Sequence, residues 1–253
     1  MEITYQMFLV VCPLLFLAGF VDAIGGGGGL ISLPAYLLAG LPYQFAVGCN
    51  KLSATCGTVL TTVRFLKNKL VNFKLALPTI FAAVAGSYAG ANLMLAMDNS
   101  FMEKFLLLML PVSALVVMNP RLFRDNPSGN LVLDAKTWII AVMVALIMGF
   151  YDGFYGPGSG TFMIIAFTLF ARMSLPQANA QTKVINLTTN ITSLTILLLE
   201  GSVVLSLGLA GAACNMLGSF LGAGLAIRNN TRVTRPVIVL VLGLLFLKIL
   251  GVF

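Results

Sequence analysis

Apolar stretches follow one another along nearly the whole chain, and this pattern limits the fold more than any other feature. They lie at residues 7–24, 30–39, 45–66, 75–97, 102–118, 137–154, 161–171, 178–199, 203–226 and 237–252. Most are long enough for an α-helix to cross a bilayer, which takes about 20 residues. Only 9% of the residues are charged, whereas a soluble domain has about 25%. The sequence therefore predicts an all-α polytopic membrane protein rather than a soluble enzyme, a nucleic-acid-binding module or a disordered linker.

The stretches 30–39 and 161–171 are too short to span a bilayer. About ten helical residues cover only ~15 Å, half of the ~30 Å hydrocarbon core. Each stretch follows a glycine-rich tract, and we call these tracts the first break (Gly25–Gly29) and the second break (Gly156–Gly160). The sequence predicts about eight full spans and two short half-helices. The alternative is that the glycine tracts are only flexible turns at the surface.

The chain contains an internal duplication. Three motifs recur in the same order at a spacing of 130 or 132 residues: Gly19-Phe20-Val21-Asp22 with Gly149-Phe150-Tyr151-Asp152, Lys51 with Lys183, and Gly86–Ala91 with Gly218–Ala223. We therefore divide the chain into a first repeat (1–118), a linker (119–136) and a second repeat (137–253), each repeat with five helical segments. The small residues of the third motif predict close helix approach within the monomer, with a homodimer through the same faces as the alternative.

Basic residues gather in the loops 64–74, 119–136 and 228–235. Loops rich in lysine and arginine face the cytoplasm. All three loops can face the cytoplasm only if the chain returns to the same side of the membrane after each short segment and the span before it. Each repeat then makes an odd number of passes. The two repeats are therefore expected to be inverted, with a cytoplasmic linker and both termini extracytoplasmic.

Inverted repeats with interrupted helices at matching positions are typical of secondary transporters, and the interruptions mark the binding site. A half-helix that begins at a glycine break directs free N–H groups and its positive dipole end toward that point, and glycine lets an oxyanion approach the backbone closely. The sequence therefore predicts a small anion as the ligand. The candidate groups are those of Gly26, Gly27, Gly28, Gly29 and Leu30 at the first break and of Gly156, Gly158, Ser159, Gly160 and Thr161 at the second.

Four charged residues lie near the breaks: Asp22, Lys51, Asp152 and Lys183. Ionisable residues inside a membrane are costly and indicate function. One interpretation is two structural ion pairs, one in each repeat. The other is that the lysines attract the anion and an aspartate carries a coupling proton. Asn50 and Asn186, beside the lysines, either line the substrate pathway or form interhelical hydrogen bonds.

The chain has no histidine, which excludes histidine metal sites and Ser-His or Cys-His catalysis. Its four cysteines lie in apolar stretches without the spacing of a zinc site. We therefore expect no enzyme activity, no cofactor and no metal.

The motifs at residues 19–29, 50–52 and 149–160 resemble those of the TauE/SafE sulfite exporter family and are most similar to its YfcA-like branch. The likeness covers essentially the whole chain, including Thr182-Lys183 with Asn186 and Arg235-Pro236. The resemblance implies a bacterial inner-membrane carrier for small sulfur-containing anions such as sulfite or organosulfonates, driven by the proton gradient. The expected partners are thus the anion, protons and the lipid bilayer, and no nucleic acid. The alternative function is a passive anion channel of the same fold.

Overall fold

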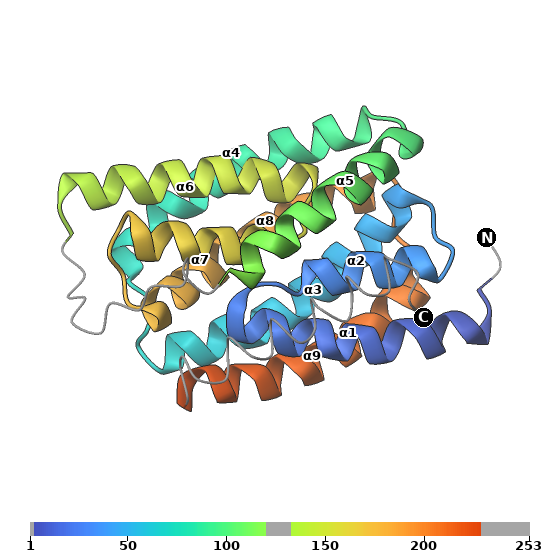
Figure 1. Ribbon diagram of the computed structural model, residues 1–253, viewed down its shortest axis with the longest axis horizontal. Helices are drawn as coiled ribbons and strands as arrows, with labels where there is room; N and C mark the ends of the chain where they lie inside the picture. Colours follow the sequence, from blue (N-terminus) through green and yellow to red (C-terminus); the bar gives the residue numbers. More distant parts are fainter. Residues whose placement is uncertain (1–2, 120–132, 229–253) are drawn as a thin grey trace.

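The computed structural model describes residues 3–119 and 133–228, and this part of the chain is helical without strands (Figure 1). Its helices are α1 (Tyr5–Gly25), α2 (Gly29–Leu38), α3 (Tyr43–Lys67), α4 (Phe73–Leu95), α5 (Asn99–Met118), α6 (Ala135–Phe154), α7 (Ser159–Leu169), α8 (Leu175–Leu199) and α9 (Leu205–Arg228). Each matches one predicted apolar segment. The tenth predicted segment, 237–252, and most of the linker lie outside the described residues.

Four of the described helices are both long and apolar enough to cross a membrane: α1, α4, α6 and the Leu205–Ile227 part of α9. The predicted all-α membrane architecture is thereby confirmed. α3 and α8 are 25 residues each, which gives about 37 Å at 1.5 Å per residue, but both carry many polar residues. α2 and α7 have only 10 and 11 residues.

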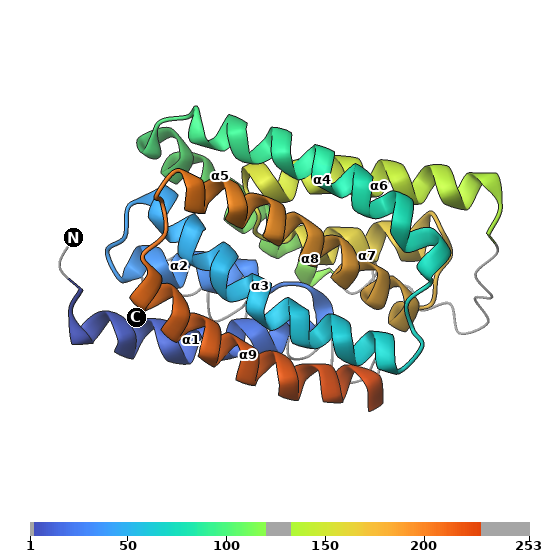
Figure 2. The same ribbon diagram turned by 180° about the vertical axis from the view of Figure 1, so that it is seen from behind.

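The helices form three layers (Figures 1 and 2). α4 and α6 form one outer layer, α1 and α9 form the opposite one, and α3 and α8 lie between them. The central position explains why α3 and α8 can be polar. Most of their polar side chains, including those of Lys51 and Lys183, are buried against other helices.

The outer pairs approach closely because small residues lie between them. A Cβ atom built at Gly86 or Gly90 of α4 would overlap a backbone oxygen of α6, and one built at Gly218 or Gly222 of α9 would overlap a backbone oxygen of α1. Both predicted glycine faces therefore pack within the monomer. The contact also fixes which helices pair, since no larger residue fits.

The short helices α2 and α7 begin where glycine lets the chain turn. Gly26 ends α1 with φ 80° and donates its N–H to the Asp22 carbonyl oxygen. Gly156 (φ 93°) and Gly158 (φ 85°) make the corresponding turn between α6 and α7. These left-handed conformations strain any residue with a Cβ. The glycines of both breaks thus turn the chain back into the molecule.

Candidate functional site

The two breaks meet at the centre of the molecule. The Thr161 hydroxyl donates to the Gly25 carbonyl oxygen at 2.9 Å. A Cβ atom built at Gly26 would lie 2.5 Å from the Gly160 carbonyl carbon, and one built at Gly29 would lie 3.1 Å from the Pro157 Cα. Segments about 130 residues apart in the sequence are therefore in backbone contact. The interpretation of the glycine tracts as surface turns is wrong for these residues, since all are buried except the half-buried Gly29.

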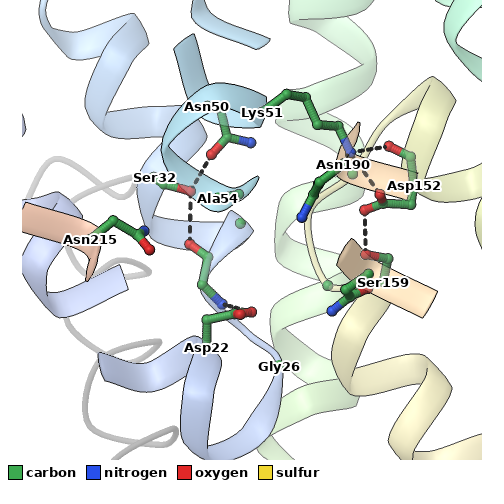
Figure 3. A pocket seen from close by; sticks show the side chains of 15 residues that line it. Asp22, Gly26, Ser32, Asn50, Lys51, Ala54, Asp152, Ser159, Asn190 and Asn215 are labelled. Carbon is green, nitrogen blue, oxygen red and sulfur yellow. Dashed lines mark hydrogen bonds and ion pairs between the residues drawn. The ribbon is translucent and has the colours of Figure 1, made fainter. Parts of the chain in front are cut away.

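A polar cavity of about 40 Å³ lies between the breaks (Figure 3). It is lined by Asp22, Gly26, Gly28, Gly29, Ser32, Asn50, Lys51, Ala54, Asp152, Gly156, Gly158, Ser159, Asn186, Asn190 and Asn215. A buried water needs about 10–15 Å³ of such volume, so the cavity has room for about three waters or a small ion of similar size. Both short helices and helices from both predicted repeats contribute to it.

The Lys51–Asp152 ion pair closes one side of the cavity. Lys51 Nζ lies 2.7 Å from Asp152 Oδ2, and it also donates to the Asp152 carbonyl oxygen at 2.8 Å and to Asn190 Oδ1 at 3.2 Å. The Ser159 hydroxyl donates to the other carboxylate oxygen, Asp152 Oδ1, at 2.6 Å. All three ammonium hydrogens and both carboxylate oxygens of this pair are engaged.

The Lys183–Asp22 ion pair lies on the opposite side. Lys183 Nζ donates to Asp22 Oδ2 at 2.6 Å. Asp22 Oδ1 accepts from the Gly28 N–H at 3.4 Å, which is longer than a typical N–H···O bond. The Lys183 side chain is fully buried, whereas that of Asp22 is 22% exposed.

The expectation of one ion pair in each repeat is wrong. Lys51 on α3 pairs with Asp152 on α6, and Lys183 on α8 pairs with Asp22 on α1, so both pairs join the two halves of the chain. The physical reason is that the two breaks are in contact, so that each lysine reaches the aspartate of the other half. Both lysines therefore have a counter-ion. An anion attracted by lysine alone would require an unpaired lysine, and neither of these two is unpaired.

The candidate residues divide into two groups. Eleven line the cavity: Asp22, Gly26, Gly28, Gly29, Asn50, Lys51, Asp152, Gly156, Gly158, Ser159 and Asn186. The others, Gly27, Leu30, Gly160, Thr161 and Lys183, lie outside its lining. Leu30 packs in the apolar core, Gly160 and Thr161 contact the first break, and Lys183 lies behind Asp22.

The lining also includes Ser32, Ala54, Asn190 and Asn215, which the site prediction from the sequence did not include. A signal existed for two of them. Asn190 lies one helical turn after Asn186, and Asn215 is the one amide side chain in the otherwise apolar α9. No sequence pattern indicated Ser32 or Ala54, because their position depends on how α2 and α3 pack.

Amide side chains present hydrogen-bond donors to the cavity. The oxygens of Asn50, Asn190 and Asn215 accept from Ser32, Lys51 and Ser219 respectively, at 2.5, 3.2 and 3.2 Å. Each amide therefore has its NH₂ group left to offer a ligand. In Figure 3 the nitrogens of Asn50 and Asn190 lie toward the space between the breaks.

Some predicted backbone donors are already occupied. The N–H groups of Gly26 and Gly28 bond to Asp22, and that of Leu30 bonds to the Gly27 carbonyl oxygen. At the second break, the Ser159 N–H donates to the Gly156 carbonyl oxygen at 3.2 Å. Polar side chains thus have a larger share in the site than the glycine pattern suggested. Among the described residues, three charged groups line the cavity, namely Asp22, Lys51 and Asp152, and Lys183 is paired with Asp22 behind the lining, so that the four charges sum to zero.

Comparison with known proteins agrees with this arrangement. The family profile described as Sulfite exporter TauE/SafE matches residues 11–249. A probable membrane transporter protein from Haemophilus influenzae is 32% identical over 241 residues, covering 95% of this chain and 93% of that protein. The probable membrane transporter protein YfcA from Escherichia coli (strain K12) is 31% identical over 260 residues, covering 98% and 94%. No solved structure matches the chain significantly.

The match extends over nearly the whole chain, and the relatives are described as membrane transporters rather than enzymes. It covers the first break, the second break and both lysine-bearing helices. The similarity to YfcA confirms the resemblance on which the sequence analysis relied. The chain therefore belongs to the TauE/SafE sulfite exporter family, and it is a multi-pass membrane protein of a transporter family.

Proposed function

We propose that this protein is a secondary transporter that carries small anions, with sulfite and organosulfonates as the leading candidates, across the bacterial inner membrane. One observation carries the proposal. The breaks of two helices meet at a single polar cavity, together with Lys51 and the amides of three helices. Irregular backbone at membrane depth is tolerated where it lines such a cavity. Broken helices around a shared central site are characteristic of secondary transporters.

The proposed transport mechanism is alternating access between two inverted repeats, residues 1–118 and 137–253, with a cytoplasmic linker at 119–136 and about eight full spans. Three observations support it. α1 and α6 run in opposite directions in Figure 1. The outer pairs α1–α9 and α4–α6 join equivalent elements of the two halves. The two ion pairs also join equivalent positions, Lys51 with Asp152 and Lys183 with Asp22.

The proposed anion site consists of the cavity-lining candidates and their immediate support. The NH₂ groups of Asn50, Asn190 and Asn215 supply uncharged donors, whereas the single hydroxyl hydrogen of Ser159 is already donated to Asp152. Lys51 supplies positive charge that Asp152 balances. Hydrogen bonds to a charged partner contribute about 1.5–3 kcal/mol each, so a few donors suffice for binding in the micromolar to millimolar range.

A flux assay tests the proposal. The full chain is reconstituted in liposomes, and uptake of sulfite and methanesulfonate is followed with and without a proton gradient. We expect saturable uptake that the gradient accelerates. Lys51→Met should reduce uptake at least tenfold, because it removes the cavity's positive charge and leaves Asp152 unpaired. Lys104→Met is the matched control, since Lys104 is exposed on α5.

The same assay separates the transporter from the passive anion channel. A channel would give uptake that does not saturate with anion concentration and does not respond to the proton gradient. Absence of anion-dependent flux under all conditions would overturn both functions.

A further inference from the structure

The two ion pairs at the cavity are related by the duplication but differ in their surroundings. Lys51 Nζ donates to three acceptors, which are the backbone carbonyl oxygen of Asp152, Asp152 Oδ2 and the amide oxygen of Asn190. Lys183 has one acceptor among the described residues, Asp22 Oδ2. An ammonium group has three N–H donors, so Lys51 is satisfied and Lys183 depends on Asp22 alone.

The two carboxylates differ in the same direction. Asp152 accepts a short 2.6 Å hydrogen bond from Ser159, seven residues later in the chain. The residue seven positions after Asp22 is Gly29, which has no hydroxyl. Within residues 3–119 and 133–228, Asp22 Oδ1 therefore receives only the long bond from the Gly28 N–H. The Asp22 side chain is 22% exposed, against 7% for Asp152, and it lines the cavity.

Because of these contacts, protonation of Asp22 breaks fewer and weaker hydrogen bonds than protonation of Asp152. A proton on Asp152 would disrupt a bond from Ser159 and the main partner of Lys51. A proton on Asp22 Oδ1 replaces only the long contact from the Gly28 N–H, and the Asp22 side chain lines the cavity. The Asp152 pair is thus fixed, and the Asp22 pair can change its protonation state.

The balance of charge at the cavity indicates at which step Asp22 is protonated. The described groups at the cavity sum to zero, so an anion that enters alone leaves a buried negative charge, which is costly. We propose, on the basis of the transport function above, that Asp22 takes up one proton together with each monovalent anion that binds. The proton comes from water on the open side and bonds to Asp22 Oδ1. Neutral Asp22 then donates its O–H toward the anion, and the charge of Lys183 is no longer cancelled.

The charged groups that face Asp22 are few. Lys183 of α8 is its direct partner, and Lys51 of α3 and Asp152 of α6 lie across the cavity. The neighbouring α2, α7 and α9 contribute uncharged groups to the cavity, including Ser32, Ser159 and Asn215. Within the described chain, Lys183 and the incoming anion are therefore the two groups that decide the protonation of Asp22. Lys183 favours the ionised carboxylate, whereas the anion favours the protonated one.

Binding of methanesulfonate tests the assignment, since this sulfonate stays ionised at every pH used. Its affinity for the purified full chain is measured by calorimetry between pH 5 and pH 8. If one proton binds with the anion, we expect the wild-type affinity to fall about tenfold per pH unit at the alkaline end. Asp22→Asn, which mimics the protonated state, should bind with an affinity that varies less than twofold over the range. The matched variant is Lys51→Met combined with Asp152→Asn, which removes one whole ion pair and keeps the sum of charges at zero. It should keep the pH slope even though its affinity is lower.

A second measurement does not depend on the variants. The binding enthalpy of the wild type in two buffers of different ionisation enthalpy gives the number of protons taken up, and we expect close to one per anion. Anion binding without proton uptake would overturn the role of Asp22 and leave the transport function standing. Loss of the pH slope in the Lys51→Met, Asp152→Asn double variant instead of in Asp22→Asn would also overturn it. Failure of the wild type to bind methanesulfonate or sulfite at any pH would overturn both.

Discussion

At the scale of single residues, the polar centre depends on partners that come from distant parts of the sequence. Asp22, Lys51, Asp152 and Lys183 could be selected from the sequence because charges are rare in apolar segments. Their pairing could not, since it depends on which central helix packs over which break. One of the two interpretations of these charges placed an ion pair within each repeat, whereas the structure joins the pairs across the two halves.

Asn215 provides a test of the cavity at this scale. Asn215→Asp has nearly the same shape but adds a negative charge beside the proposed anion site. We expect methanesulfonate affinity to fall at least tenfold while the helical circular dichroism spectrum is unchanged. Asn92→Asp is the control, because Asn92 is exposed on α4 and should bind like the wild type. Equal affinity in Asn215→Asp would place the anion away from α9.

Asp134 caps α6 and gives a prediction about pH. It accepts from the Thr137 N–H at 2.8 Å. The Thr137 hydroxyl and N–H, which donate to its carboxylate, hold the pKa of Asp134 below the ordinary value of 3.8. A carboxylate whose pKa is lower in the folded than in the unfolded state stabilises the fold at every pH above its unfolded-state pKa. This stabilisation is lost as the pH falls through its folded-state pKa.

Asp134→Ala should therefore lower the melting temperature at pH 7 and have a smaller effect at pH 3, below the ordinary pKa of 3.8. Thermal unfolding in detergent at the two pH values is the measurement. Asp98→Ala is the matched control, since Asp98 precedes α5 without a side-chain capping bond. An effect of Asp134→Ala that is equal at both pH values would contradict the capping role.

At the scale of helices, element positions followed the sequence closely. Apolar length fixed the nine described helices to within a few residues, and the glycine tracts fixed the starts of α2 and α7. The packing partners of α3 and α8 could not be predicted as well from the sequence. Their polar residues indicate burial among other helices, but not which helices cover them.

The contact between α4 and α6 gives a prediction at this scale. A Cβ atom at Gly86 would overlap the Leu146 carbonyl oxygen and approach the Phe150 nitrogen to 2.8 Å. Because these are backbone atoms, Gly86→Ala must push the helices apart, and overpacking of this kind costs about 1–3 kcal/mol. We expect a melting temperature several degrees lower in detergent. Ala85→Val, at an exposed position of α4, should melt like the wild type, and a similar loss there would point to a general effect of side-chain size.

At the scale of the whole molecule, the orientation in the membrane remains a prediction from loop charges. The connection between α3 and α4 and the connection between α8 and α9 lie at opposite ends of the bundle (Figure 1). Lys69 belongs to the first connection and Glu200 to the second. In a cysteine-free background, we expect Lys69→Cys to react with a membrane-impermeant maleimide only after the cytoplasmic side is opened. Glu200→Cys should react in intact spheroplasts. The reverse pattern would invert the proposed topology.

The crossed ion pairs also have a consequence for biosynthesis. The positions of Lys51 and Asp152 are 101 residues apart, which a ribosome takes roughly 5–20 s to translate. During this interval the newly inserted Lys51 has no counter-ion from its native partner. We expect the early helices to stay near the aqueous interior of the insertion machinery until the later ones emerge. Withdrawal of the lysine from water is then one of the last steps of assembly.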